Sequence, residues 1–585
     1  NGKVLLTKSF SHGGRKLVNA LGSLFQVKRD STFYYSDIKN EGSLLLEGDS
    51  RGHLENFSNG GSLFMGRVSD LTVREFESSG PLNVEGQMKW SGRLFKTTKS
   101  TRLYGKSALF VSKLETNGHF TALDDLALLG VSGGDATWHH LGGIATLAKR
   151  GVFGLNLLTS AGGSTLHLLV DNQGYIKTFV HSGPLTMGSV SNLFVNNFFS
   201  HGAFDVTGPM SWIGNVFKTK QATFKDKTSI TAPIIETNGP LTAESELTLA
   251  GDWHHKKGVA EIAKLFFMGR KIKNEDTVSI EEMPDVTGTT VQRIAELEND
   301  SGNADSPAQF RIGEGIVEVE RLLNRNGGKV FLEEGECRVG YLENPESVLT
   351  VDWLFPLDAR TPEWVLTGTV AAKHLFFPER TSISKVIIRG KVLCGEAQVE
   401  VADVLGEVGS ELTLGVEELS PGPSSFKGQT FTSRGVVKSA APVTWNGRSF
   451  ETSGPMHLTQ ASTITAPHIK TSADFTAQDT LTLKGDWTHK AGKADIAKLF
   501  FEGRVITNHS DILIRELPYT TGYFGSAIEQ TITTLNNGDH NTENRAQKPL
   551  FRIMKGGAHL HDTTNWWGTL VLEDGTYKFE KLCNI

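Results

Sequence analysis

Residues 229–267 read SITAPIIETNGPLTAESELTLAGDWHHKKGVAEIAKLFF, and the chain repeats this stretch downstream. Residues 463–501 read TITAPHIKTSADFTAQDTLTLKGDWTHKAGKADIAKLFF, so every matching position is displaced by the same interval, from 229 to 463. Repetition over such a length is typical of arrays in which each repeat contacts only its neighbours. The sequence therefore predicts a repetitive scaffold, and residues that build a scaffold need not touch a ligand.

Weaker copies of the pattern extend upstream. The motif Trp-x-Gly-x-x-Phe-x-Thr occurs three times, beginning at Trp90, Trp212 and Trp445. A second motif, in which Trp is followed two residues later by His, begins at Trp138, Trp253 and Trp487. The repeating unit is therefore a long module and not a short motif.

The fine pattern inside a module is that of short strands. Apolar residues alternate with polar ones, as in Leu247-Thr248-Leu249, and turn residues such as Asn238-Gly239 interrupt them. Alternate residues of a strand face the same side, and 63 Gly against 18 Pro suit many tight turns. We predict an all-β fold, a right-handed parallel β-helix with coils of roughly 20 residues and on the order of 29 coils.

Two segments depart from the coil pattern. In residues 289–299, Ile294 and Leu297 share one face of a helical projection with Val291 and Ala295, which predicts a short helical excursion near 285–305. A comparable excursion follows Pro518 and spans about 519–547, with a polar loop near its end.

The domain organisation follows from these features. We expect irregular β-helix coils at 1–57, module 1 at 58–178, module 2 at 179–345, irregular coils at 346–430 and module 3 at 431–585. The chain begins at Asn1 without an initiator Met, and at Ile585 the repeat is still matching. We therefore expect the rest of a longer chain at both ends.

Composition argues against several partners. The 59 Lys and Arg against 65 Asp and Glu give a net charge of −6 that is dispersed along the chain, which disfavours nucleic acid. No apolar run approaches the ~20 residues that a transmembrane segment needs. The three cysteines are far apart and lack metal-site spacing; they are Cys337, Cys394 and Cys583. We expect no cofactor and no metal.

Three groups of residues invite a catalytic interpretation, but each has a simpler structural one. His254 and His255 are neighbours, so on a strand they face opposite sides and cannot easily share a metal. The carboxylates of Asp252 and Asp486 recur with the module, whereas a catalytic pair is normally unique, and Asp124-Asp125 reads the same way, as turn or cap residues. The tryptophans of the first motif could stack on sugars, yet their fixed spacing to a Phe favours a core role; they are Trp90, Trp212 and Trp445.

A family resemblance rests on the cadence Asn-Gly-x-Leu-x-Ala-x-x-x-Leu-x-Leu. It stands at residues 238–249 and is echoed at 117–128 and 59–71. This cadence resembles the haemagglutinin-type repeats of filamentous haemagglutinins and the shafts of contact-dependent inhibition toxins. The resemblance implies a secreted bacterial exoprotein, exported by a two-partner system, whose long β-helical shaft carries adhesive or toxic parts at the cell surface or outside the cell.

These observations lead to one functional hypothesis and an alternative. We expect a structural shaft segment of an adhesin or toxin-delivery filament, without catalytic residues. The alternative is a polysaccharide-cleaving lyase or hydrolase, which would need a non-repeated cluster of charged residues within about 345–428.

If the segment binds a receptor or glycan on a host or neighbouring cell, we expect the excursions to do so, because the ladders present the same faces repeatedly. The candidate binding residues are Glu298, Asn299, Asp300, Asn536, Asn537, Asp539 and His540.

Overall fold

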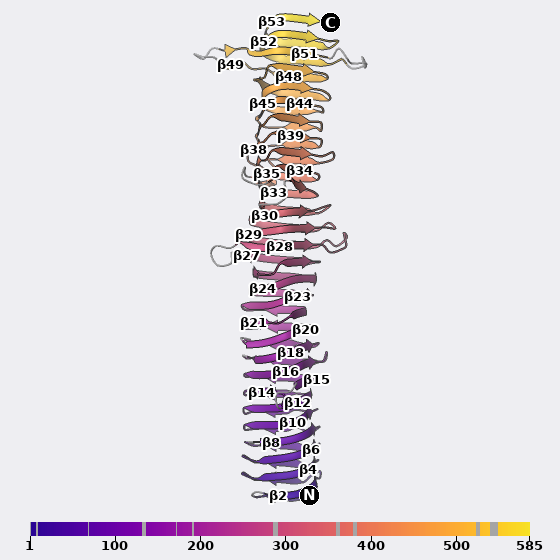
Figure 1. Ribbon diagram of the computed structural model, residues 1–585, viewed down its shortest axis with the longest axis vertical. Coiled ribbons are helices and arrows are strands. Elements are labelled where there is room, and N and C mark those ends of the chain that lie inside the picture. The colour runs from indigo at the N-terminus through magenta and orange to yellow at the C-terminus, as the bar shows by residue number, and fades with distance from the viewer. Residues whose placement is uncertain are drawn as a thin grey trace. The chain divides into compact units, whose positions relative to one another are not determined.

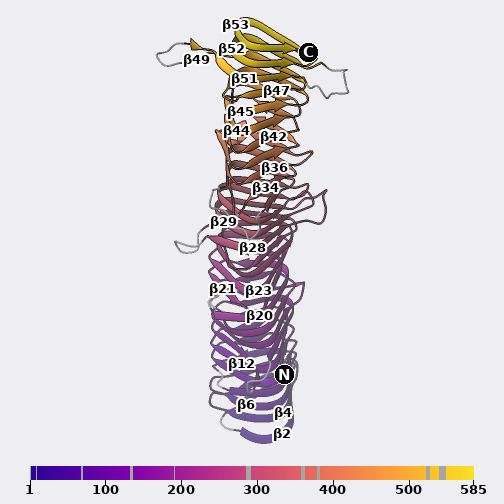
Figure 2. The same ribbon diagram turned by 45° about the horizontal axis from the view of Figure 1, so that its top comes forward.

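The computed structural model describes residues 2–7, 10–67, 70–131, 136–170, 172–189, 192–284, 291–357, 363–377, 383–521, 527–538 and 548–585. The chain divides into two units, residues 1–286 and 287–585. In each unit, short strands wind around one axis and stack on the strands of the previous turn (Figures 1 and 2). Strand accounts for 73% of the chain, in about 28 turns of a parallel β-solenoid, so the all-β prediction is confirmed.

The first unit contains strands β1 to β27. Their bounds are β1 Lys3–Leu6, β2 Phe10–Asn19, β3 Leu24–Val27, β4 Thr32–Asn40, β5 Ser43–Leu46, β6 Arg51–Asn59, β7 Ser62–Met65, β8 Asp70–Ser78, β9 Leu82–Val84, β10 Met88–Thr97, β11 Thr101–Leu103, β12 Ser107–Asn117, β13 Phe120–Ala122, β14 Leu126–Leu129, β15 Ala136–Leu147, β16 Gly151–Ser160, β17 Ser164–Leu168, β18 Gln173–His181, β19 Leu185–Met187, β20 Asn192–Val206, β21 Met210–Ile213, β22 Val216–Phe224, β23 Thr228–Asn238, β24 Leu241–Lys257, β25 Val259–Phe267, β26 Lys271–Asn274 and β27 Thr277–Met283.

The second unit contains strands β28 to β53 and one short 3-10 helix, η2. Their bounds are β28 Gln292–Asn299, β29 Gln309–Asn324, β30 Lys329–Glu343, β31 Val348–Pro356, β32 Glu363–Leu366, β33 Thr369–Phe377, β34 Lys385–Ile388, β35 Lys391–Glu400, β36 Asp403–Gly406, β37 Glu411–Leu414, η2 Glu417–Leu419, β38 Ser424–Lys427, β39 Thr430–Ser433, β40 Val436–Ser439, β41 Val443–Asn446, β42 Ser449–Thr452, β43 Met456–Leu458, β44 Ser462–Thr471, β45 Phe475–His489, β46 Lys493–Phe501, β47 Val505–Asn508, β48 Asp511–Glu516, β49 Thr520–Thr521, β50 Ala527–Ile528, β51 Gln530–Asn537, β52 Leu550–Asn565 and β53 Thr569–Asn584.

Strand register stacks equal positions of successive turns. In the most regular part the turns have equal lengths, so Phe57 of β6 pairs with Phe76 of β8, and Phe76 pairs with Phe95 of β10. These pairings are parallel, which places the strands of one face about 4.8 Å apart. In the described residues the antiparallel exception is the small pair of β49 and β50.

Apolar ladders fill the interior as the alternation predicts. Leu247 pairs with Leu265, and Leu249 pairs with Phe267, all within the buried core. Leu481 and Leu483 repeat this arrangement in the second unit, so the inward orientation predicted for all four leucines is confirmed. The tryptophans of the Trp-x-Gly motif are also buried and contact phenylalanine rings, as a core role requires; they are Trp90, Trp212 and Trp445.

A second ladder, which we call the corner ladder, consists of buried polar residues at one corner of most turns; in β32, β34 and β36 the position in register with Ser433 is Leu366, Ile388 and Gly406. Its amides bond from turn to turn: Asn19 Nδ2 donates to Asn40 Oδ1 at 2.6 Å, and Asn40 Nδ2 donates to Asn59 Oδ1 at 2.6 Å. In the first unit its members are Asn19, Asn40, Asn59, Ser78, Thr97, Thr116, His140, Ser160, His181, Ser200, Thr219, Thr237, His255 and Asn274. In the second unit they include Asn299, Asn324, Asn344, Ser433, Thr452, Thr471, His489, Asn508, Asn537 and Asn565.

The Trp-x-His motif forms a hydrogen-bonded relay inside this ladder. The indole Nε1–H donates to the Thr hydroxyl of the previous turn at 3.1 Å, and that hydroxyl lies 2.8–2.9 Å from the His Nδ1. The His Nε2 lies 2.7–3.2 Å from a glycine carbonyl three residues on. We call the three copies the Thr–Trp–His relays: Thr116, Trp138 and His140; Thr237, Trp253 and His255; Thr471, Trp487 and His489.

Donor chemistry fixes the protonation of the relays. The indole can only donate and the carbonyl can only accept, so the hydroxyl proton points at Nδ1 and the imidazole carries its proton on Nε2. Burial lowers the pKa of the three relay histidines, which keeps them in this neutral form. The structural interpretation is therefore confirmed for the His that stands two residues after the Trp in each copy, His140, His255 and His489.

The glycine whose carbonyl ends each relay adopts a backbone conformation that favours glycine. Gly143, Gly258 and Gly492 have φ of 79°, 86° and 80°, in the left-handed region that favours glycine. A Cβ on Gly258 would lie 2.6 Å from the backbone carbon of Gly239, so the turns approach too closely for a side chain.

The helix predicted at 289–299 is wrong for its described part. Gln292–Asn299 is strand β28, which pairs in parallel with β29. The side chains of Ile294 and Leu297 both point inward because a bend between them shifts the strand alternation by one residue. Two short alternating runs separated by a bend therefore imitate the three-residue spacing of a helix.

The segment without a repeat partner, 346–430, also forms solenoid turns in its described part. The interval between paired residues is unequal here: Trp353 pairs with His374, Lys385 with Asp403, and Gln398 with Ser425. Unequal turns explain why this segment shows no internal repeat in the sequence.

Candidate functional site

The residues expected to bind at the first excursion lie at the end of β28 and just beyond it. Asn299 is fully buried, and its Nδ2 donates to Asn324 Oδ1 at 2.8 Å. Asp300 caps the following turn, because its Oδ1 accepts from the Gly302 amide at 2.8 Å and from Asn326 Nδ2 at 2.6 Å. Asn299 is thus a corner-ladder residue and not a surface ligand, while Glu298 and Asp300 are half-buried.

The second excursion gives a similar result. Asn537 is fully buried and its Nδ2 donates to Asn565 Oδ1 at 2.7 Å, so its side chain also belongs to the corner ladder. Asn536 is half-buried. Asp539 and His540 lie outside the described residues. Expecting Asn299 and Asn537 at the surface was wrong, because the last polar residue of a strand turns inward at this corner.

The repeated carboxylates act as turn caps. Asp252 Oδ1 accepts from the backbone amides of Arg270 and Lys271 on the next turn, at 3.1 and 3.0 Å. Asp486 Oδ1 repeats this with two amides at 3.0 Å. Asp124 accepts from the Asp125 amide at 2.9 Å, and this bond holds the pKa of Asp124 below its usual value. The cap interpretation is confirmed for all three.

The buried cysteines and the outward-facing His254 do not form a reactive site. Burial raises the pKa of Cys337 and of Cys394 to about 12, so neither forms a thiolate near neutral pH. His254 points outward, opposite to His255, and its Nε2 lies 2.9 Å from Glu275. The two histidines therefore face opposite sides, as predicted.

One non-repeated surface does stand out, on the outer face of β31, β33 and β35. Trp353 is 37% exposed and stacks on the His374 ring, with centroids 4.0 Å apart and planes at 22°. Phe355 lies 5.9 Å from Trp353, and Phe376 lies 5.5 Å from Phe355. We call these four rings the aromatic platform. Strand alternation sends all four outward, on two adjacent rows of the sheet.

Polar groups border the platform on both sides. On the β35 side, Glu396 lies 3.5 Å from His374 Nδ1, and its other oxygen accepts from Gln398 Nε2 at 2.7 Å. On the β30 side, Arg338 donates to Glu336 at 2.7 Å and to Glu318 at 3.1 Å. An apolar surface with hydrogen-bonding groups at its edges suits a ligand that has both an apolar face and hydroxyl groups.

Two of the three carboxylates beside the platform, Glu336 and Glu396, lie on its opposite edges. Glu336 and Glu396 are separated by three strand steps, Glu336 to Trp353 to His374 to Glu396. Three steps of about 4.8 Å place them roughly 14 Å apart. Glycosidase carboxylates stand about 5–9.5 Å apart. The backbone separation of Glu336 and Glu396 exceeds that range, whereas Glu318 and Glu336 both contact Arg338 on one edge of the platform.

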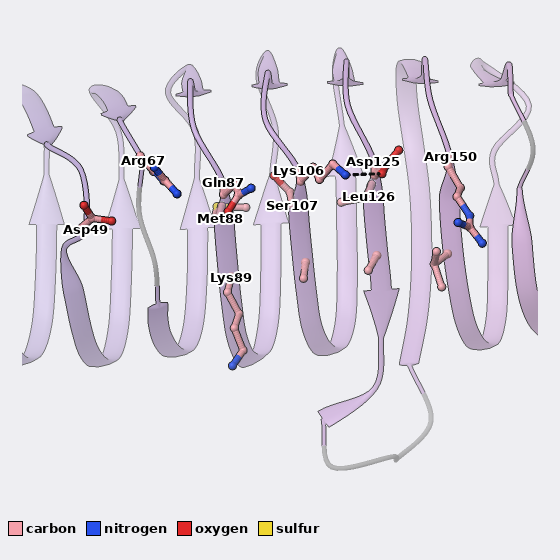
Figure 3. Close-up of a pocket in the computed structure, with 13 residues that line it drawn as sticks. Asp49, Arg67, Gln87, Met88, Lys89, Lys106, Ser107, Asp125, Leu126 and Arg150 are labelled. Atoms are coloured by element: carbon pink, nitrogen blue, oxygen red, sulfur yellow. Dashed lines mark ion pairs between the residues drawn. The ribbon is translucent and has the colours of Figure 1, made fainter.

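A second surface is a charged groove of about 530 Å³ on the first unit. Figure 3 shows Asp49, Arg67, Lys106, Asp125 and Arg150 along one row of successive turns. Lys106 and Asp125 pair at 3.4 Å, and Arg150 donates to Gln173. With Lys89, four cations and two carboxylates line the groove. Lys106 and Asp125 neutralise each other within it, while Lys89 pairs with Asp70 outside the groove lining.

Comparison of the chain with protein-family models, with curated proteins and with solved structures finds no match. Within the described residues, no helix is long and apolar enough to cross a membrane. The class that the fold defines is thus the parallel β-solenoid.

The aromatic platform was not among the residues predicted from the sequence. The available signal was the spacing of Trp353 and Phe355, two aromatic residues at alternate positions of a strand-like run. The two residues lie in the segment without a repeat, so their spacing does not recur in the modules and a role in the repeated scaffold does not account for it.

Proposed function

We propose that this chain is a shaft segment of a large secreted or surface-displayed bacterial filament of the adhesin or toxin-delivery type, which acts in attachment or presentation. The observation that carries the proposal is the recurrence of one internal device in both units. The Thr–Trp–His relay occurs with nearly the same distances at His140, His255 and His489. Residues that recur in this way serve the stacking of turns.

The outer surface supports the same role through ion pairs between neighbouring turns. Arg515 pairs with Asp495 through two nitrogen–oxygen contacts of 3.0 Å. Each exposed pair is worth only about 0–1 kcal/mol, but pairs on successive turns add along the stack. Others of this kind join Lys96 to Glu77, Arg311 to Glu333, Lys385 to Glu363 and Lys498 to Glu516.

Attachment, in this proposal, uses the aromatic platform. The apolar C–H face of a sugar ring packs on the electron-rich face of an indole, and its hydroxyls reach the groups at the platform edge. Trp353 offers such a face, and Gln398, Glu396 and Arg338 stand beside the platform. A neutral or acidic glycan of a neighbouring cell is the partner that fits.

The test is glycan binding together with product analysis. The intact chain is incubated with neutral and acidic glycans, and bound ligand, new reducing ends and unsaturated products are measured. We expect binding without new products, and at least about fivefold weaker binding for Trp353→Ala, because stacking on an aromatic ring is worth about 1 kcal/mol or more.

Tyr34→Ala is the matched control, because Tyr34 is a 48% exposed aromatic residue of the first unit, whereas the platform belongs to the second. Its binding is expected to equal that of the unmodified chain. Cleavage products from any glycan would contradict the shaft proposal and favour the enzyme alternative. An equal loss of glycan binding in both variants would show that the aromatic platform is not the binding surface.

A further inference from the structure

A cluster of metal-ligand side chains lies on the outer face of β52 and β53. His559 and His561 belong to β52, and Glu580 belongs to the next turn, on β53. One ligand atom from each of the three side chains lies within 4.8 Å of the other two. His559 Nε2 is 3.4 Å from Glu580 Oε1, and His561 Nδ1 is 2.8 Å from Glu580 Oε2.

Strand geometry explains why these three groups converge. His559 and His561 are two residues apart, so both project from the same face, unlike the adjacent His254 and His255. Their rings stack with centroids 4.4 Å apart and planes at 27°. Parallel register puts Phe579 beside Leu560, so Glu580 follows on the same outer face as His561.

A cation beside the cluster, the ammonium group of Lys578, pairs with a carboxylate outside the cluster. Lys578 pairs in register with His559, and its charge would oppose a metal ion bound there. Its Nζ lies 2.6 Å from Glu529 Oε2, however, which engages the ammonium group with a different carboxylate. The three exposed fractions, 33%, 35% and 56% for the side chains of His559, His561 and Glu580, leave the cluster open to solvent and to an incoming ion.

We propose that His559, His561 and Glu580 form a Zn²⁺ site. Two imidazole nitrogens and one carboxylate oxygen are a donor set that zinc takes, with water in the remaining position. Donor atoms around a tetrahedral zinc at about 2.1 Å stand roughly 3.4 Å apart. His559 Nε2 and Glu580 Oε1 already have that separation, and distances of up to 4.8 Å in the cluster have to contract by up to about 1.4 Å through side-chain rotation.

The bound ion would join two consecutive turns, β52 and β53. Metal binding that requires both turns in place stabilises their contact by linkage. The role assigned to the site is therefore a clip between β52 and β53. This inference does not depend on the proposed shaft function.

Zinc titration of the full chain tests the site. After chelator treatment and dialysis, isothermal calorimetry with ZnCl₂ is expected to give one site per chain. Each of His559→Gln, His561→Gln and Glu580→Gln is expected to weaken binding at least about tenfold, since even outer-shell changes cost 10–100-fold at zinc sites. Mg²⁺, which prefers oxygen ligands, is expected not to compete.

His254→Gln provides the matched control, because His254 also lies beside a glutamate at 2.9 Å but offers only one imidazole. Its zinc affinity is expected to stay unchanged. Hydrogen exchange gives a second readout: zinc is expected to slow exchange in β52 and β53 and not in β10 or β12. One-site binding that survives in the double variant His559→Gln/His561→Gln would overturn the proposal. So would the absence of binding at zinc concentrations up to about 100 μM.

Discussion

Removing a single oxygen atom is enough to break a Thr–Trp–His relay. Thr237 Oγ1 accepts from Trp253 Nε1 at 3.1 Å and lies 2.8 Å from His255 Nδ1. Thr237→Val keeps the shape of the side chain but removes the hydroxyl group. The indole N–H and the imidazole Nδ1 then both lose their partner in a buried environment.

The cost follows from the number of orphaned groups. A buried polar group without a partner costs about 1–3 kcal/mol, so two groups predict a loss of roughly 2–6 kcal/mol. Thr219→Val is the matched control, one turn earlier on the same ladder, since Thr219 Oγ1 donates one hydrogen bond, to the Gln221 carbonyl at 3.0 Å. Its expected cost is about 0.5–1.5 kcal/mol.

Hydrogen exchange with mass spectrometry measures both costs locally. The Thr237→Val loss should be confined to peptides of β22, β23, β24 and β26, because each turn of a solenoid contacts only its neighbours. Peptides of β10 and β12 should keep their protection. If Thr237→Val costs no more than Thr219→Val, or if protection falls equally throughout the first unit, the reasoning about the relay is refuted.

Three further predictions concern the interior. His181 is buried and its pKa is lowered from 6.5 to about 4, first by burial. Below pH 6.5 the unfolded chain therefore takes up the proton that the folded chain refuses, so local stability at β18 should fall by about 2 kcal/mol between pH 7 and pH 5. Hydrogen exchange of β18, corrected for the pH dependence of the intrinsic exchange rate, measures this loss of stability. If a His181→Asn variant lost the same stability between pH 7 and pH 5, His181 would not be its cause. Leu249→Ala should cost about 2–5 kcal/mol near β24, and a loss spread evenly over the unit would contradict the nearest-neighbour picture. Gly258→Ala should cost at least about 1–2 kcal/mol because φ there is 86°, whereas Gly162→Ala, with no heavy atom within 4 Å of the added Cβ, should cost little; equal melting temperatures would refute the argument.

Much of the fold could be predicted because the repeating geometry of a solenoid requires residue types that repeat along the sequence. The alternation at Leu247 and Leu249 gives the inward face, and the fixed spacing of Trp212 to Phe217 gives a core contact. The helix predicted at 289–299 was wrong because strand bends are invisible in a single sequence. The spacing of Ile294 and Leu297 fits a helix as well as a bent strand.

The candidate sites were harder to predict because they depend on which residues meet across turns. Asn299 and Asn537 read as loop residues, and only the register shows that they complete a buried ladder. The aromatic platform joins residues of successive turns in a segment without a repeat. The His559–Glu580 cluster joins residues on consecutive turns in the same way, although the His-x-His spacing on a strand was visible in the sequence.

The location of the chain on the cell that produces it tests the shaft proposal most directly. An epitope tag inserted at the open turn of Gly162-Gly163, where an added side chain meets no heavy atom within 4 Å, leaves the ladders intact. We predict that antibody labels this tag on intact cells, and that external protease removes the label. Label that appears only after the cells are permeabilised would contradict the proposal that the chain is a displayed shaft.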